Sequence, residues 1–189
     1  MDYGFGRLDT LLKEKNEFDK DKISKDNLVI IAPSYGKDNL LEVCGIEIIT
    51  VLLKANFKVL LRPHFKIFKE SKHLIQEIRE KFEKYENFVL EEGIIESEKF
   101  HSSKCLISDW SGISLEYAFT FERPVIFIDV PKKILNPDFK EISVEPIEIS
   151  IRDKIGYLIH PKNLISIPEK IKQIDESDLA EEIKKIRSN

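Results

Sequence analysis

The stretch CLISDWSGISLEYAFTFERPVIFID, residues 105–129, decides the fold of this 189-residue chain. An apolar run, Cys105–Ile107, meets a polar turn, a helical segment follows, and a second apolar run, Val125–Ile128, begins just after Pro124. Two strands joined by a helical crossover of this length are expected to lie parallel in one sheet. The turn therefore lies at the carboxyl end of the first strand and at the amino end of the helix.

This turn, Ser108–Gly112, has the character of an anion site. Backbone N–H groups at a helix start have no partner within the helix, and the helix dipole favours a negative ligand there. Ser111 adds a hydroxyl, Gly112 permits close approach to the backbone, and Glu116 could accept hydrogen bonds from a ribose. We expect a phosphate group as the ligand. The alternatives are that Ser111 only caps the helix, that Glu116 only satisfies the dipole, and that Trp110 packs in the interior instead of stacking on a base.

The rest of the chain repeats the same strand and helix alternation. The predicted strands cover residues 28–32, 58–61 and 88–90, and the predicted helices cover residues 8–18, 39–55, 70–85 and 97–103. Short, continuously apolar strands alternating with helices predict an α/β fold, a Rossmann-like parallel sheet flanked by helices on both faces. Asn39 with Glu42 three residues later resembles a capping box at the start of the helix over residues 39–55. Beyond Asp129 the signals weaken into alternating apolar positions, Ile142, Val144, Ile147 and Ile149, where no firm element is predicted. The next element that the sequence predicts is a charged helix after Ser166.

Composition excludes several classes of function. The net charge of -4 and the absence of long basic runs argue against a nucleic-acid partner. No segment has the length of a membrane span or the pattern of a signal peptide, so we expect a cytoplasmic protein. Cys44 and Cys105 lie in apolar segments and read as reduced core residues. His73, His101 and His160 form no cluster at metal-ligand spacing, so neither a metal nor another cofactor is predicted.

The loops after the other predicted strands supply further candidates. Arg62 and His64 stand at the end of a strand, where a guanidinium binds a phosphate oxygen and an imidazole donates a proton to a leaving phosphate. Tyr35 and Gly36 offer a hydroxyl and a permissive turn to a substrate. Each of these also has a plain interpretation as a surface-loop residue. For Asp109 a structural hydrogen-bonding role is favoured over metal binding, because no second carboxylate lies at a useful spacing.

Four segments in order, YGFGRLDTL, IIAPSYG, LLRPHF and LISDWSGISLEYAFTFERPVIFID, resemble the carboxyl-terminal, nucleotide-binding half of the CDP-glycerol glycerophosphotransferase family. These enzymes make teichoic acids and related capsule polymers of the cell wall and have a GT-B fold. The resemblance implies that His64 matches a histidine that contacts the donor phosphates. It also implies that Ser111 and Gly112 cradle the pyrophosphate and that Glu116 lies near the ribose. Gly112 replaces the family's second serine, which is similar to the Ser-Gly-Gly turn of nonhydrolysing UDP-N-acetylglucosamine 2-epimerases.

The family resemblance implies a transferase reaction. An acceptor hydroxyl of a polymer would attack the β-phosphorus of CDP-glycerol, or of a related CDP-alcohol donor, and expel CMP. His64 would be the catalytic residue. The substrate-binding residues implied by the turn and the resemblance are Arg62, Ser111, Gly112, Ile113, Ser114, Glu116, Tyr35, Gly36 and Asp109.

By the same resemblance, residues 1–26 form an interdomain linker with the first helix, and residues 27–189 form the donor-binding domain. An amino-terminal domain would supply the acceptor site and peripheral attachment to the inner face of the membrane, and this chain alone is expected to be inactive. Two alternatives stay open. One is a GT-B sugar-nucleotide enzyme, a UDP-sugar glycosyltransferase or an epimerase. The other is a nonenzymatic nucleotide-binding module.

Overall fold

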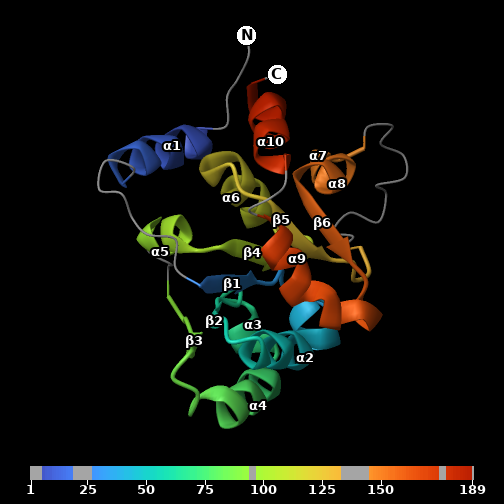
Figure 1. Ribbon diagram of the computed structural model, residues 1–189. Helices are drawn as coiled ribbons and strands as arrows, with labels where there is room; N and C mark the ends of the chain where they lie inside the picture. The colour runs from blue at the N-terminus through green and yellow to red at the C-terminus, as the bar shows by residue number, and fades with distance from the viewer. Residues whose placement is uncertain (1–5, 19–26, 94–96, 133–144, 175–177, 189) are drawn as a thin grey trace.

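The computed structural model describes residues 6–18, 27–93, 97–132, 145–174 and 178–188. Within these residues all strands belong to one parallel sheet with the order β3-β2-β1-β4-β5-β6 (Figure 1). The order reverses between β1 and β4, and ligands of such sheets bind at that reversal, beyond the carboxyl ends of the strands. The strands are β1 (Leu28–Ala32), β2 (Lys58–Leu61), β3 (Phe88–Leu90), β4 (Cys105–Ser108), β5 (Val125–Ile128) and β6 (Gly156–Ile159).

Helices cover both faces of the sheet, which confirms the predicted Rossmann-like α/β class (Figure 1). One face packs against α2, α3, α4, η3 and α9, and the other packs against α6, α8 and α10, with α1 and α5 beside α6. The helices are α1 (Gly6–Phe18), α2 (Leu40–Lys54), α3 (Ile67–Glu70), α4 (Lys72–Phe82), α5 (Ser97–Ser102), α6 (Ile113–Phe121), α7 (Ile147–Ser150), α8 (Arg152–Ile155), the 3₁₀ helix η3 (Pro161–Ser166), α9 (Ile167–Gln173) and α10 (Leu179–Ser188).

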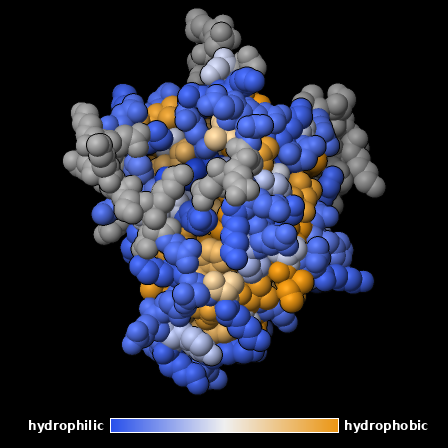
Figure 2. Space-filling view, viewed as in Figure 1, coloured by the Kyte–Doolittle hydropathy of each residue, from blue (hydrophilic) through white to orange (hydrophobic). Residues whose placement is uncertain are grey.

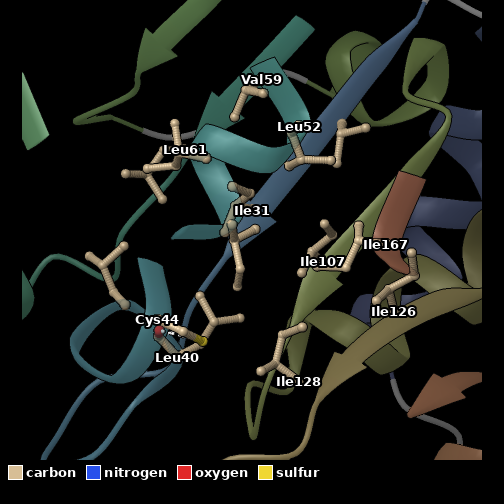
Figure 3. Packing of buried hydrophobic residues seen from close by; sticks show 14 of the residues in the cluster. Ile31, Leu40, Cys44, Leu52, Val59, Leu61, Ile107, Ile126, Ile128 and Ile167 are labelled. Carbon is tan, nitrogen blue, oxygen red and sulfur yellow. Dashed lines mark hydrogen bonds between the residues drawn. The ribbon is translucent and has the colours of Figure 1, made fainter. Parts of the chain in front are cut away.

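The central strands are apolar on both sides because both sides are covered. In β1, Val29 and Ile31 join the larger core cluster, whereas Ile30 joins the cluster on the opposite face. Figure 3 shows Ile31 beside Ile107 in the larger cluster, with α2 packed over them. Each such side chain, fully buried, contributes about 1.5–3 kcal/mol to the stability of the folded state. The molecular surface in the same view as Figure 1 is largely hydrophilic, with hydrophobic areas interspersed (Figure 2).

The start of α2 has one of the two hydrogen-bonding features of the predicted capping box. The side-chain oxygen of Asn39 accepts hydrogen bonds from the amides of Leu41, at 2.9 Å, and Glu42, at 3.3 Å, so Asn39 is the N-cap that the sequence predicted. In a capping box the Glu42 carboxylate would accept a hydrogen bond from the amide of Asn39. Here it accepts instead from the amide of Asp38, at 3.0 Å.

The sequence missed strand β6. Its sequence, GYLI, begins with glycine and tyrosine and lacks a continuous apolar run, and Leu158 is 48% exposed because β6 lies at the edge of the sheet. Gly156 permits the pairing, since a Cβ there would lie 1.9 Å from the carbonyl oxygen of Val125. Of the alternating apolar positions after Asp129, Ile147 and Ile149 belong to α7, and positions 142 and 144 lie outside the described residues.

Among the described residues, none of the helices combines the length and the apolar character that crossing a bilayer requires.

Candidate functional site

The loops after β1 and β4 are tied together by Asp109, at the point where the strand order reverses. Asp109 is 1% exposed. One carboxylate oxygen accepts from the amide of Ser34, at 2.7 Å. The other accepts from the Ser34 hydroxyl, at 3.0 Å, and from the amide of Leu40, at 2.8 Å. Asp109 therefore has the loop-orienting role that the sequence favoured, and a direct contact with a ligand stays a prediction.

The turn between β4 and α6 leaves backbone amides without hydrogen bonds at the start of the helix. Gly112 is the N-cap of α6, and no side chain caps the helix, so the alternative that Ser111 merely caps it is wrong. Within the described part of the chain, the backbone N–H groups of Ser111, Gly112 and Ile113 make no hydrogen bond. Gly112 is exposed, and no atom lies within 4 Å of the position that a Cβ would take there. Three amides at a helix start thus have no hydrogen-bond partner among the described residues and adjoin open space at Gly112, as an anion site requires.

Ser114 shapes this turn from the inside. It is 4% exposed, and its hydroxyl and its amide both donate to the carbonyl oxygen of Ser111, at 2.7 Å and 3.0 Å. With that carbonyl engaged, the Ser111 hydroxyl remains half-exposed beside Gly112. The structure thus gives Ser114 a supporting position, and Ser111 the one from which a ligand contact is feasible.

Glu116 lies one turn into α6, between two cavities. Its carboxylate forms an ion pair with Arg7 of α1, with 2.8 Å between the Arg7 Nε and a Glu116 oxygen. The larger cavity, about 520 Å³, lies between α1, α5 and α6 and is lined by aliphatic and aromatic side chains together with the polar residues Arg7, Thr10, Glu14 and Glu116. The smaller, about 310 Å³, borders Gly112 and Glu116. Glu116 therefore stands beside both the exposed turn and the larger cavity.

The loop after β2 places His64 against the loop after β1. The ring centroids of His64 and Tyr35 lie 4.5 Å apart, and the Lys66 ammonium lies 4.2 Å from the Tyr35 ring centroid. The amide of Lys66 donates to the His64 Nδ1, at 3.3 Å. Because Nδ1 accepts, the neutral ring carries its proton on Nε2, which is the donor that a phosphate oxygen needs.

Arg62 and Gly36 complete these two loops. The Arg62 amide donates to the carbonyl of Ile31, at 2.9 Å, which extends the pairing of β1 and β2, and its side chain is half-buried. Gly36 has a φ of 99°, a conformation that glycine adopts without strain. The permissive turn predicted at Gly36 is therefore confirmed. All these loops lie at the same edge of the sheet because every strand runs in the same direction.

Behind the turn lies a residue that the sequence analysis missed, Arg152 of α8. Its guanidinium lies 3.8 Å from the ring centroid of Trp110, whose indole N–H donates to the carbonyl of Val130, at 3.0 Å. One face of Trp110 is covered in this way, which favours packing over base stacking. Burial lowers the pKa of Arg152, and Asp129 partly opposes that shift. A lone arginine in a region without a predicted element carries no sequence signal.

Neither cysteine takes part in the site. Cys44 and Cys105 are both buried, and among the described residues neither is in a disulfide, as predicted. Among the described residues, no group of three or more histidine, cysteine, aspartate or glutamate side chains could hold a metal ion.

The fold is shared with nucleotide-binding enzymes of the GT-B type. The wall teichoic acid polymerase TagF matches with a TM-score of 0.61 and 20% identity, over 100% of this chain and 46% of that one. The C-terminal CMP-Kdo binding domain of WaaA from Acinetobacter baumannii matches with a TM-score of 0.55 and 12% identity, over 95% of this chain and 99% of that one. A UDP-GlcNAc 2-epimerase from Methanocaldococcus jannaschii matches with a TM-score of 0.52 and 11% identity, over 95% of this chain and 50% of that one.

No curated protein sequence matches the chain. The chain spans less than half the length of TagF, and identities of this size establish the fold alone. A family model described as CDP-Glycerol:Poly(glycerophosphate) glycerophosphotransferase matches residues 1–133. Since this match covers most of the 189 residues, the chain belongs to the CDP-glycerol:poly(glycerophosphate) glycerophosphotransferase family and has the fold of the carboxyl-terminal half of a GT-B enzyme.

Proposed function

We propose that this chain is the donor-binding part of a glycerophosphotransferase and holds the diphosphate of CDP-glycerol, or of a related CDP-alcohol, on the turn from Ser111 to Ile113. The observation that carries the proposal is the set of three backbone amides that make no hydrogen bond within the described residues and adjoin open space at Gly112. A solved form of TagF soaked with CDPG supports this choice of donor.

The proposed reaction forms a bond between an acceptor oxygen and the β-phosphorus and breaks the bond from that phosphorus to the CMP oxygen. The turn amides and Arg62 would offset the charge that develops on the leaving phosphate, and His64 would donate the proton that CMP takes up. Such groups act by position and electrostatics. We place the base that removes the acceptor proton, the polymer acceptor and attachment to the inner face of the membrane in a domain amino-terminal to these residues, consistent with the 46% coverage of TagF.

The cleft between α1, α5 and α6 is the proposed place of the nucleoside. Its volume of about 520 Å³ and its mixed lining, with aromatic rings beside a few polar groups, suit a pyrimidine nucleoside. One Glu116 oxygen holds Arg7, which leaves the other oxygen for the ribose hydroxyls. Residues 1–26 would then be a linker whose helix contributes one wall of the donor site, and residues 27–189 the domain itself.

Calorimetric titration with CDP-glycerol, CDP, CMP and UDP-N-acetylglucosamine tests the proposal. We expect CDP-glycerol and CDP to bind about ten-fold more tightly than CMP, because only they place a second phosphate on the turn amides. Ser111→Ala and His64→Ala should each weaken CDP binding, whereas the control Ser188→Ala, at an exposed serine of α10, should not.

The result also separates the competing functions. Tighter binding of UDP-N-acetylglucosamine than of CDP-glycerol would favour a sugar-nucleotide enzyme. Two observations support that alternative, the glycine at position 112 and the fold shared with the UDP-GlcNAc 2-epimerase. Unchanged CDP affinity in both site variants would move the donor away from this turn. Donor binding without turnover when an amino-terminal domain is present would favour a nonenzymatic nucleotide-binding module.

A further inference from the structure

A buried cation lies directly behind the turn that is proposed to hold the donor. Arg152 is 3% exposed, and its guanidinium lies between two aromatic rings, 3.8 Å from the centroid of Trp110 and 4.8 Å from that of Phe127. Phe127 belongs to β5, and Trp110 immediately precedes Ser111. The Arg152 guanidinium therefore connects α8, strand β5 and the turn.

The polar contacts of Arg152 are weak for so buried a charge. Its Nη2 donates to the carbonyl of Ile128 at 3.4 Å, and its Nη1 lies 3.9 Å from an Asp129 oxygen. Its Nε has no hydrogen-bond partner among the described residues. Asp109 and Asp129 are the acidic groups that act on it, and Asp109 already accepts three hydrogen bonds from the β1 loop. Burying a charge with so few polar contacts costs free energy of folding. If packing were the only role of this position, an apolar side chain of similar length would give a more stable fold.

The position of Trp110 is set by contacts on two sides. Its indole N–H donates to the carbonyl of Val130, and the Arg152 guanidinium covers its ring. Because Trp110 precedes Ser111 in the chain, these contacts restrict the backbone whose next three amides make no hydrogen bond among the described residues. A loosened Trp110 would let those amides turn away from a common ligand.

We propose that Arg152 is a positioning residue for the donor diphosphate, which holds Trp110 in place, aligns the amides of Ser111, Gly112 and Ile113, and adds positive potential behind them. This inference rests on the proposed function. Arg152 lies outside residues 1–133, the part of the chain that the family model matches, and inside a helix that the sequence did not predict.

The test uses the fluorescence of Trp110, because the chain contains 1 tryptophan and the signal therefore comes from this residue. CDP and inorganic pyrophosphate are titrated into the wild type, R152M, R152K and the control R187M. Arg187 is a suitable control because it is a half-buried arginine of α10 that donates to the carbonyl of Phe119 and pairs with Glu122 at the far end of α6. Fluorescence quenching by acrylamide measures the access to Trp110, and thermal unfolding checks that each variant is folded.

We expect R152M to weaken CDP and pyrophosphate binding about ten-fold and to increase the acrylamide quenching of Trp110. R152K, which keeps the charge and loses the planar stack, should recover part of the affinity while the quenching stays high. R187M should match the wild type in both measurements. In the unmutated protein the Arg152 Nε–Hε signal in NMR should shift when CDP binds, and this readout does not depend on the folding of a variant.

Folded Arg152 variants with wild-type affinity, or an Arg152 signal that is unmoved in the CDP-bound wild type, would overturn this inference and leave the proposed function in place. Failure of the wild type to bind CDP or pyrophosphate would overturn both. A role in stability alone would appear as a lower unfolding temperature with unchanged affinity, and that outcome also counts against the proposal.

Discussion

Replacement of Asp109 by alanine should be among the most damaging single changes near the site. The side chain is 1% exposed and accepts hydrogen bonds from the amides of Ser34 and Leu40 and from the Ser34 hydroxyl. In Asp109→Ala the two amides keep their buried positions and lose their acceptor. The hydroxyl can rotate toward another partner, so it is left out of the sum.

Each buried donor without an acceptor costs about 1–3 kcal/mol, so the two amides together cost about 4 kcal/mol. Asp109→Asn keeps the shape of the side chain and one acceptor oxygen but directs an NH₂ group at a donor. The free energy of unfolding should fall by about 3 kcal/mol in this variant. Against the total stability of about 5–15 kcal/mol that is usual for a single domain, either loss is large.

Urea unfolding followed by circular dichroism measures these differences, with the slope of free energy against urea compared between variants. Ser34→Ala is the matched control, because it removes one hydroxyl donor, and it should cost about 1 kcal/mol. A loss below about 1 kcal/mol in a folded Asp109→Ala protein would show that water or a rearranged loop satisfies the two amides, and the loop-orienting role of Asp109 would be refuted.

Two glycines should respond in opposite ways to added bulk. Gly112→Val should stay within about 1 kcal/mol of wild-type stability in urea while weakening CDP binding, because its side chain enters the space where a phosphate would approach. Gly156→Ala should lose about 3 kcal/mol, since its methyl group would lie 1.9 Å from a backbone oxygen of β5. Glu116→Gln should weaken CDP binding and leave inorganic pyrophosphate binding unchanged, as calorimetry can show, because only CDP carries a ribose; equal losses for both ligands would contradict the ribose assignment. Burial raises the pKa of Cys44 from 9.0, and that of Tyr117 from 10.0, to about 12 in each case. Above pH 9.0 the unfolded chain therefore releases protons that the folded chain keeps, so these two groups should lower the unfolding temperature as the pH rises from 9.0 toward 12. Cys44→Ala combined with Tyr117→Phe should flatten that fall, and an unchanged slope would contradict the assignment.

Agreement between sequence and structure is closest where neighbours along the chain determine the conformation. The apolar run at residues 28–32 became β1, Asn39 became the cap of α2, and the unit at residues 105–129 became β4, α6 and β5. Agreement failed at β6, where four residues at the edge of the sheet lack the apolar continuity of a central strand. The predicted capping-box bond of Glu42 is also absent, because its carboxylate accepts hydrogen bonds from Asp38 and Ser71 instead.

In the candidate site, too, the local features could be predicted from the sequence and the long-range contacts could not. The position of the turn proposed to bind the anion could be predicted because a strand, a polar turn with glycine and a helix are adjacent in sequence, and their order places the amides at the carboxyl edge of the sheet. The partners of those residues could not be predicted. Asp109 meets Ser34 across 75 positions of sequence, Glu116 meets Arg7 of α1, and Trp110 meets Arg152 of α8.

The sequence by itself thus determined the parallel α/β fold and predicted an anionic ligand at one edge of the sheet, since hydrophobic periodicity and helix termini are local properties. Tertiary structure alone decided the position of β6, the burial of Asp109 and the cation behind Trp110. A charged side chain has many partners available in an unfolded chain. Only the packing of distant elements removes it from water and selects one of them.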